Sequence, residues 1–91
     1  GTDGLREIAN LDLRMYPNPT EGELYILPKT DRNYQMNVEI LDLQGKVIQN
    51  QFINTNSINT INLNQVNSGM YLIKLVNTEN GKFTTRKVLV N

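Results

Sequence analysis

The stretch GMYLIKLVNTENGKFTTRKVLVN, residues 69–91, decides the fold of this chain. It holds two runs rich in β-branched and aromatic residues, 70–76 and 82–90, on either side of the turn-forming sequence TENG at 78–81. Two such runs joined by a short Gly-containing connection are typical of a β-hairpin. Both faces of the first run are apolar, which predicts a central strand that is covered on both sides.

Upstream of this hairpin, apolar and polar residues alternate in further short runs, as expected for half-buried strands. These runs lie at residues 11–15, 21–27, 34–40, 46–52 and 58–63. We expect Pro28 to end the second run, and we expect Asp42 to cap the tight turn before the fourth. No window carries the apolar stripe of a helix. About seven short strands at regular spacing predict an all-β, immunoglobulin-like antiparallel β-sandwich without a disulfide or a core tryptophan.

Length and composition predict one small domain. We interpret residues 1–10 as a linker and residues 11–91 as the β-sandwich. The absence of cysteine and histidine from all 91 residues excludes disulfides, thiolate chemistry, the usual zinc sites and imidazole bases. Nine basic residues balance nine acidic ones, so no net charge draws the domain to nucleic acid or anionic lipid. No apolar run reaches the roughly 20 residues of a membrane span.

The carboxylates are the only groups suited to acid–base chemistry. Asp12, Asp31, Glu39 and Asp42 fall at outward or turn positions of the expected strands. Without a nucleophile or a base beside them, a solvated surface or turn-forming role is favoured over a catalytic pair. The TENG turn lacks the alternating Asp/Asn pattern of a calcium loop. We therefore predict no enzyme activity, no cofactor and no metal.

Positive charge gathers on the last run, at Lys82, Arg86 and Lys87. Charges on an unpaired edge strand protect a sheet from aggregation, and this interpretation is favoured from the residues alone. The same strand also suits a partner that adds a strand of its own, which makes a recognition strip the alternative. Reasoning from the residues ends at a β-sandwich module without an active site.

Asn18-Pro19-Thr20-Glu21 has the composition of a type I turn, and Gly22 is suited to a positive φ. This segment opens a series of four motifs that resembles the C-terminal sorting domains of the type IX secretion system of Bacteroidetes. The motifs are a Tyr-Pro-Asn-Pro-x-x-Gly segment, an acidic Gly-containing turn after an apolar strand, a Gly-x-Tyr strand and a basic-apolar closing strand. The matching residues are Tyr16, Pro17, Asn18, Pro19 and Gly22, then Ile40, Asp42, Gly45 and Val47, then Val66 (in place of the commoner Leu), Gly69 and Tyr71, and finally Lys87, Val88, Leu89 and Val90.

The resemblance implies a secretion signal at the C-terminus of a larger cargo protein. Such a tail passes through the periplasm, is read by the type IX translocon at the outer membrane, and is usually cleaved by a cell-surface sortase. The cargo then stays at the cell surface or is secreted. The cleavage zone would lie within 1–10, and recognition would centre on the final strands. The motif and recognition residues that we select are Pro17, Asn18, Pro19, Gly22, Gly45, Gly69, Tyr71, Arg86, Lys87, Val88 and Val90.

Two other functions stay open. One is a non-catalytic immunoglobulin- or fibronectin-like accessory or carbohydrate-binding module of a secreted multidomain protein. An exposed aromatic row with bound glycan would distinguish it. The other is a structural spacer, for which native sequence continuing well beyond Asn91 would be decisive.

Overall fold

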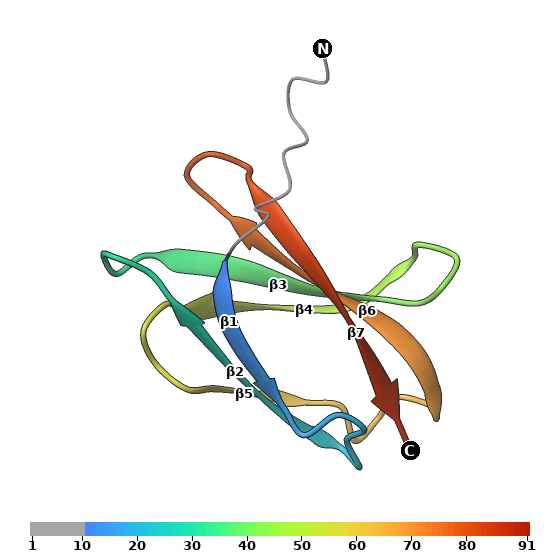
Figure 1. Cartoon of the computed structure of the whole chain (residues 1–91). Coiled ribbons are helices and arrows are strands. Elements are labelled where there is room, and N and C mark those ends of the chain that lie inside the picture. The colour runs from blue at the N-terminus through green and yellow to red at the C-terminus, as the bar shows by residue number, and fades with distance from the viewer. Residues whose placement is uncertain (1–10) are drawn as a thin grey trace.

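The computed structural model describes residues 11–91, and these residues form seven β-strands and no helix. Figure 1 shows the strands in chain order. They are β1 (Asp12–Tyr16), β2 (Glu23–Lys29), β3 (Gln35–Leu41), β4 (Val47–Asn54), β5 (Asn59–Asn62), β6 (Gly69–Asn77) and β7 (Phe83–Val90). The proposed linker, residues 1–10, lies outside the described residues.

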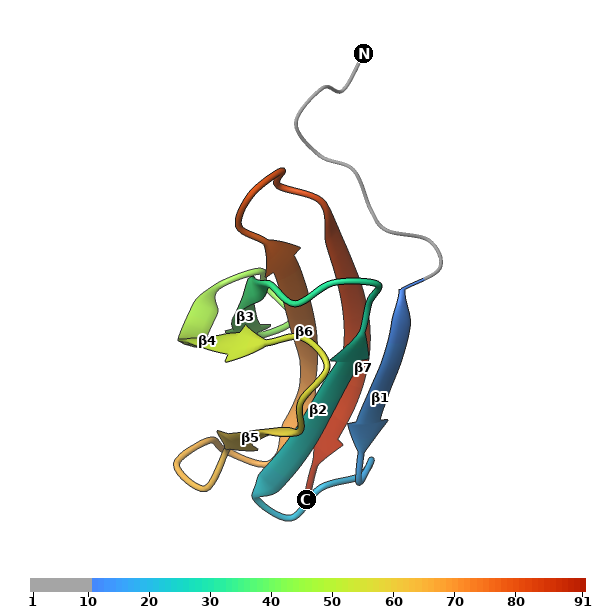
Figure 2. The same ribbon diagram turned by 90° about the vertical axis from the view of Figure 1, so that its left-hand side faces the viewer.

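The strands form two antiparallel sheets with the orders β1-β2-β5 and β4-β3-β6-β7. Figure 2 shows the two layers, with β1, β2 and β5 in one and β3, β4, β6 and β7 in the other. A constant-type immunoglobulin sandwich has its fourth strand in the sheet of the first. Here the fourth strand lies in the other sheet. Domains of this class share the two-layer architecture and can differ in topology. The predicted all-β, immunoglobulin-like antiparallel sandwich is therefore confirmed.

The core lies between the sheets and follows the period-two alternation of each strand. On β3, for example, Met36, Val38 and Ile40 are all at most 1% exposed. Side chains from five other strands or their ends complete the core: Leu24, Ile26, Ile53, Ile61, Leu63, Tyr71, Ile73, Leu75, Val88 and Val90. Val66, in the connection before β6, packs against its margin.

Pro28 does not end β2, contrary to the prediction. It lies within the strand and pairs with Leu13 of β1. The Asn56 N–H donates to the Pro28 carbonyl at 2.6 Å. Since the N–H and C=O of a residue in an antiparallel strand point to the same side, the missing donor faces away from β1. Pairing with β5 has already stopped at Ile26, so no ladder hydrogen bond is lost.

The interpretation of β6 is right in one respect and wrong in another. The strand is central, between β3 and β7, as predicted. It is covered on one face only: Ile73 and Leu75 are fully buried, whereas Met70 is 39% exposed. The three-stranded sheet covers the inner face, and no element within residues 11–91 forms a layer over the outer face. There the Lys74 ammonium lies 4.6 Å from the centre of the Phe83 ring.

The turn between β3 and β4 forms as expected. The Asp42 carboxylate accepts hydrogen bonds from the Gln44 and Lys46 N–H groups at 3.0 and 2.9 Å. Gly45 has a φ of 88°, which a glycine adopts without steric penalty.

Candidate recognition surface

The loop between β1 and β2 is hydrogen-bonded to the end of β7. The Asn18 side chain donates from Nδ2 to the Lys87 carbonyl at 3.1 Å and accepts at Oδ1 from the Leu89 N–H at 3.0 Å. The Thr20 N–H donates to the Leu89 carbonyl and the Asn91 N–H donates to the Thr20 carbonyl, both at 2.9 Å. Figures 1 and 2 both show the loop beside the C-terminus. We call this contact, made by Asn18 and Thr20 with 87–91, the terminal seam.

The predicted type I turn at 18–21 is replaced by this seam. Thr20 forms a parallel β-bridge with Val90, and its N–H and C=O bond to Leu89 and Asn91. No hydrogen bond joins the Glu21 N–H to the Asn18 carbonyl, which is the bond that closes a type I turn. The peptide bonds before Pro17 and Pro19 are both cis.

Thr20 and Gly22 hold the loop in this position. Thr20 is fully buried, and its hydroxyl donates to the Glu23 carbonyl at 2.5 Å and accepts from the Gly22 N–H at 3.2 Å. Gly22 has a φ of 149°, and a Cβ there would lie 2.0 Å from the Asn64 Oδ1. A side chain at Gly22 therefore meets both backbone strain and a clash.

The start of β6 lies directly across from the end of β7. Gly69 pairs with Val90, and Tyr71 pairs with Val88. Tyr71 is 9% exposed, and its hydroxyl donates to the Asn67 carbonyl at 2.6 Å. A tyrosine that bonds the backbone a few residues upstream is a feature of immunoglobulin-like sandwiches, where it is known as the tyrosine corner.

Arg86 and Lys87 lie on opposite faces of β7 because strand side chains alternate. Lys87 is exposed on the outer face. Arg86 is half-buried on the inner face, and its Nη1 donates to the Thr84 Oγ1 and the Thr85 carbonyl, each at 3.0 Å. The two cations therefore do not form one continuous strip on a single face. Val88 and Val90, at 0% and 3% exposed, belong to the core.

The fold brings most of the selected motif and recognition residues together at one end of β7 and places one of them, Gly45, elsewhere. Three motifs meet at the end of β7: the loop at 17–22, the start of β6 and the closing strand. Gly45 does not meet them, since it lies in the β3–β4 turn and two strands separate β4 from β7. The sequence reasoning missed Thr20, which occupies an unspecified position of the Tyr-Pro-Asn-Pro-x-x-Gly motif. Its only sequence signal is a hydroxyl residue between Pro19 and Gly22.

A family model for the secretion system C-terminal sorting domain matches residues 14–91. The chain belongs to this sorting-domain family. No curated protein and no solved structure matches it. Membership implies a type IX secretion C-terminal sorting signal and export across the outer membrane to the cell surface or the medium. The family resemblance inferred from the four motifs is confirmed.

Most ionisable side chains within residues 11–91 are exposed, whereas Tyr71 is buried and Arg86 is half-buried. A hydrogen bond from the Tyr25 hydroxyl to the Glu23 carboxylate, at 3.1 Å, raises the pKa of Tyr25. Arg32 and Glu79 form an ion pair at 2.6 Å that raises the pKa of Arg32 and lowers that of Glu79. Within residues 11–91, no three acidic, His or Cys side chains gather where they could hold a metal. The sorting-domain family is non-catalytic in general.

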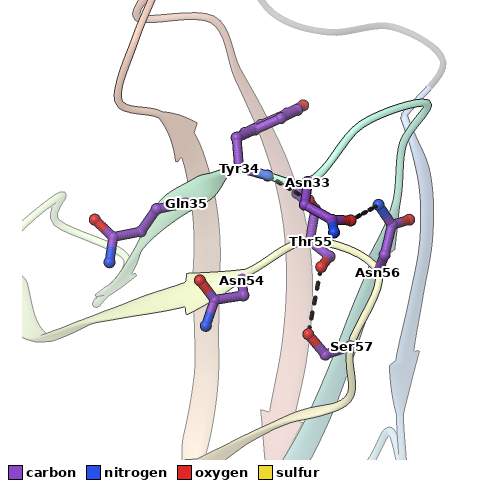
Figure 3. A pocket seen from close by; sticks show the side chains of 7 residues that line it. All are labelled: Asn33, Tyr34, Gln35, Asn54, Thr55, Asn56 and Ser57. Carbon is purple, nitrogen blue, oxygen red and sulfur yellow. Dashed lines mark hydrogen bonds between the residues drawn. The ribbon is translucent and has the colours of Figure 1, made fainter.

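The surface hollows of the sorting domain are shallow and open. One, of about 430 Å³, lies between the ends of β3 and β4 and is lined by the seven residues drawn in Figure 3. Its polar groups bond to one another: the Tyr34 N–H donates to the Thr55 hydroxyl at 2.9 Å, and the Asn56 amide donates to the Asn33 side chain at 2.8 Å. Amides and hydroxyls paired in this way supply no acid or base. The described residues also contain no helix suited to crossing a membrane.

Proposed function

We propose that this domain is the C-terminal export signal of a larger cargo protein and that the type IX machinery reads it at the terminal seam. The observation that carries the proposal is the joining of the two ends of the family match. Asn18 and Thr20, near its start, hydrogen-bond to Lys87, Leu89 and Asn91 at its end.

The seam makes the signal depend on folding. Asn18 lies 71 residues from Leu89 in the chain, so the two meet only in the folded sandwich. A receptor that binds the seam would therefore bind folded domains and ignore nascent ones. The exposed Lys87 side chain beside it adds a charge that a partner can read.

Family membership supports the remaining steps of the proposal. The cargo precedes the domain in the same chain, passes through the periplasm and crosses the outer membrane through the type IX translocon. A cell-surface sortase then cleaves within residues 1–10, upstream of the sandwich. The partners are proteins of this machinery, and the domain itself performs no catalysis and needs no cofactor.

A carbohydrate-binding or other accessory function is a second candidate, favoured by one observation. Tyr16, 45% exposed, lies 5.6 Å from Tyr25 between ring centres. Tyr25 also lines a shallow hollow of about 610 Å³ with Pro17 and Pro19. Aromatic side chains at a surface can stack on sugar rings. Calorimetric titration with oligosaccharides tests this candidate, and saturable binding that Tyr25→Ala removes would favour it over a signal role.

The export proposal is tested with a reporter cargo fused before the chain in a bacterium that has type IX secretion. We expect the intact fusion in the medium or at the cell surface, and a fusion lacking 87–91 in the periplasm. Undiminished export of the shortened fusion would refute the proposal.

That deletion also removes the core residues Val88 and Val90, so a second variant separates recognition from folding. Lys87→Glu changes an exposed charge and keeps the main-chain seam. Lys82→Glu makes the same change on another exposed lysine, beyond the other end of β7. We expect export to fall with Lys87→Glu and to persist with Lys82→Glu. Equal export of both would exclude a role for the Lys87 charge.

A further inference from the structure

Two of the outer strands of the sandwich have their edges occupied. The terminal seam fills the edge of β7 at Lys87, Leu89 and Asn91. On β5, the Asn62 and Thr60 carbonyls accept hydrogen bonds from glutamine side chains of β4. Their donors are Gln49 Nε2, at 2.9 Å, and Gln51 Nε2, at 3.1 Å.

The edge of β4 itself is open over its central part. The Asn54 N–H and C=O bond to the Asn59 side chain, at 3.2 and 2.9 Å, and therefore point away from β3. Because direction alternates along a strand, the main-chain groups of Phe52 and Asn50 point the same way. Within residues 11–91, β3 is the only strand that pairs with β4. No group in this part of the chain hydrogen-bonds to the main chain of Asn50 or Phe52 at the edge that faces away from β3. Each thus offers one donor and one acceptor.

The composition of β4 leaves this edge unprotected. The strand reads VIQNQFIN and carries no charge and no proline, which are the usual protections of an edge strand. A register shift lies at its start, opposite Ile40 and Leu41, so the pairing with β3 is regular from Gln49 to Asn54. Phe52 is 58% exposed on the outer face, beside the open main chain.

We propose that β4 pairs antiparallel with β4 of a second copy of this chain. A two-fold axis perpendicular to the sheet brings Asn50 and Phe52 of each copy opposite the same pair of the other. Donors then face acceptors along both strands, which is the self-complementarity that an isologous interface requires. Since β4 carries no charge, the pairing brings no like charges together. The two four-stranded sheets become one continuous sheet, and Phe52 packs across the junction.

The interface is small, so the association is weak. Edge pairing over a few residues with one aromatic per copy belongs among the smallest specific interfaces. We expect a dissociation constant between about 10 μM and about 1 mM. The dimer is independent of the export function proposed above, and either proposal can fail without the other.

Sedimentation equilibrium of the 91-residue chain up to about 1 mM tests the proposal. Phe52→Lys places a charge on the edge, and Asn50→Pro removes its outward N–H while keeping the ladder to β3. We expect each to raise the dissociation constant at least about tenfold. Met70→Lys is the matched control: it changes another exposed apolar residue, on the outer face of β6, and should leave association unchanged. Circular dichroism verifies the fold of each variant. Should Asn50→Pro fail to fold, the test of the dimer rests on Phe52→Lys.

Hydrogen exchange gives the second measurement. Under the proposal, the Asn50 and Phe52 amides exchange more slowly as protein concentration rises. A chain that stays monomeric at the highest concentration would overturn the proposal. So would a dimer that Phe52→Lys leaves intact, or one that Met70→Lys abolishes, since the latter would indicate packing of outer sheet faces.

Discussion

The Asn18 side chain takes the place of a neighbouring strand for Leu89. Its Oδ1 accepts the Leu89 N–H at 3.0 Å, while its Nδ2 donates to the Lys87 carbonyl at 3.1 Å. A primary amide carries the same donor and acceptor as a peptide group, so it can continue a ladder where no strand is available. Thr20 then continues the pairing with its own main chain. The last strand is thus held on both sides, by β6 and by the seam.

The first prediction concerns this amide. Asn18→Ala removes both hydrogen bonds, and because the site is exposed we expect a loss of about 1–2 kcal/mol in the free energy of unfolding. For a domain of this size, the melting temperature should fall by about 4–8 °C for each kcal/mol. Asn67→Ala is a suitable control. Its side chain makes no hydrogen bond within residues 11–91, so the change should stay within about 0.5 kcal/mol. Equal losses in the two variants would mean that the Asn18 side chain contributes no stability through its hydrogen bonds to β7.

The second prediction concerns Gly22. Gly22→Ala forces a Cβ onto a φ of 149° and within 2.0 Å of the Asn64 Oδ1, so we expect a loss of about 2 kcal/mol or more. Denaturant unfolding measures it. The double variant Gly22→Ala/Asn64→Ala removes the contact and keeps the backbone strain, so it should recover only part of the loss relative to Asn64→Ala. Full recovery would show that the clash alone makes glycine necessary.

The fold could be predicted from the sequence because the patterns that determine it lie within short segments of the chain. Alternation with period two assigns the inner faces, and segments such as Asp42–Gly45 form turns within a few residues. The outer face of β6 was misjudged because apolar residues such as Met70 and Leu72 also occur on an uncovered sheet face, and composition does not distinguish the two. Pro28 was misjudged because its tolerance depends on which side of β2 its nitrogen faces.

The terminal seam could not be predicted from local patterns. Asn18 and Leu89 lie 71 residues apart, and the sequence around Asn18 has all the features of a local turn. Only the placing of β7 at the edge of its sheet, with β1 and β2 in the layer beside it, brings them together. Thr20 was missed for the same reason, since its burial depends on β7.

The third prediction concerns the tyrosine corner. Tyr71→Phe removes the hydroxyl that donates to the Asn67 carbonyl at 2.6 Å and leaves the ring in place. We expect a loss of about 1–2 kcal/mol, seen as a lower denaturant midpoint with an unchanged slope. Tyr25→Phe removes a more exposed hydroxyl, bonded to Glu23, and should lose about 0.5 kcal/mol or less. A changed slope for Tyr71→Phe would instead indicate that the β5–β6 connection has come loose.

The fourth prediction concerns the ion pair between Arg32, before β3, and Glu79, in the β6–β7 turn. The Arg32 guanidinium, 2.6 Å away, lowers the pKa of the folded-state Glu79 carboxyl below its ordinary value. A carboxyl whose pKa is lower in the folded state contributes stability above its unfolded pKa and loses it as pH falls through its folded pKa. Melting temperatures measured from about pH 7 to about pH 3 should therefore fall less steeply for Glu79→Gln than for the unaltered chain. Both side chains are more than half exposed, at 60% and 54%, so about 1 M salt should screen most of the difference.

Glu21→Gln serves as the control because Glu21 forms no ion pair within residues 11–91, and it should keep the unaltered pH profile. Identical profiles for Glu79→Gln and the unaltered chain at low salt would show that the pair does not hold the two loops together in solution.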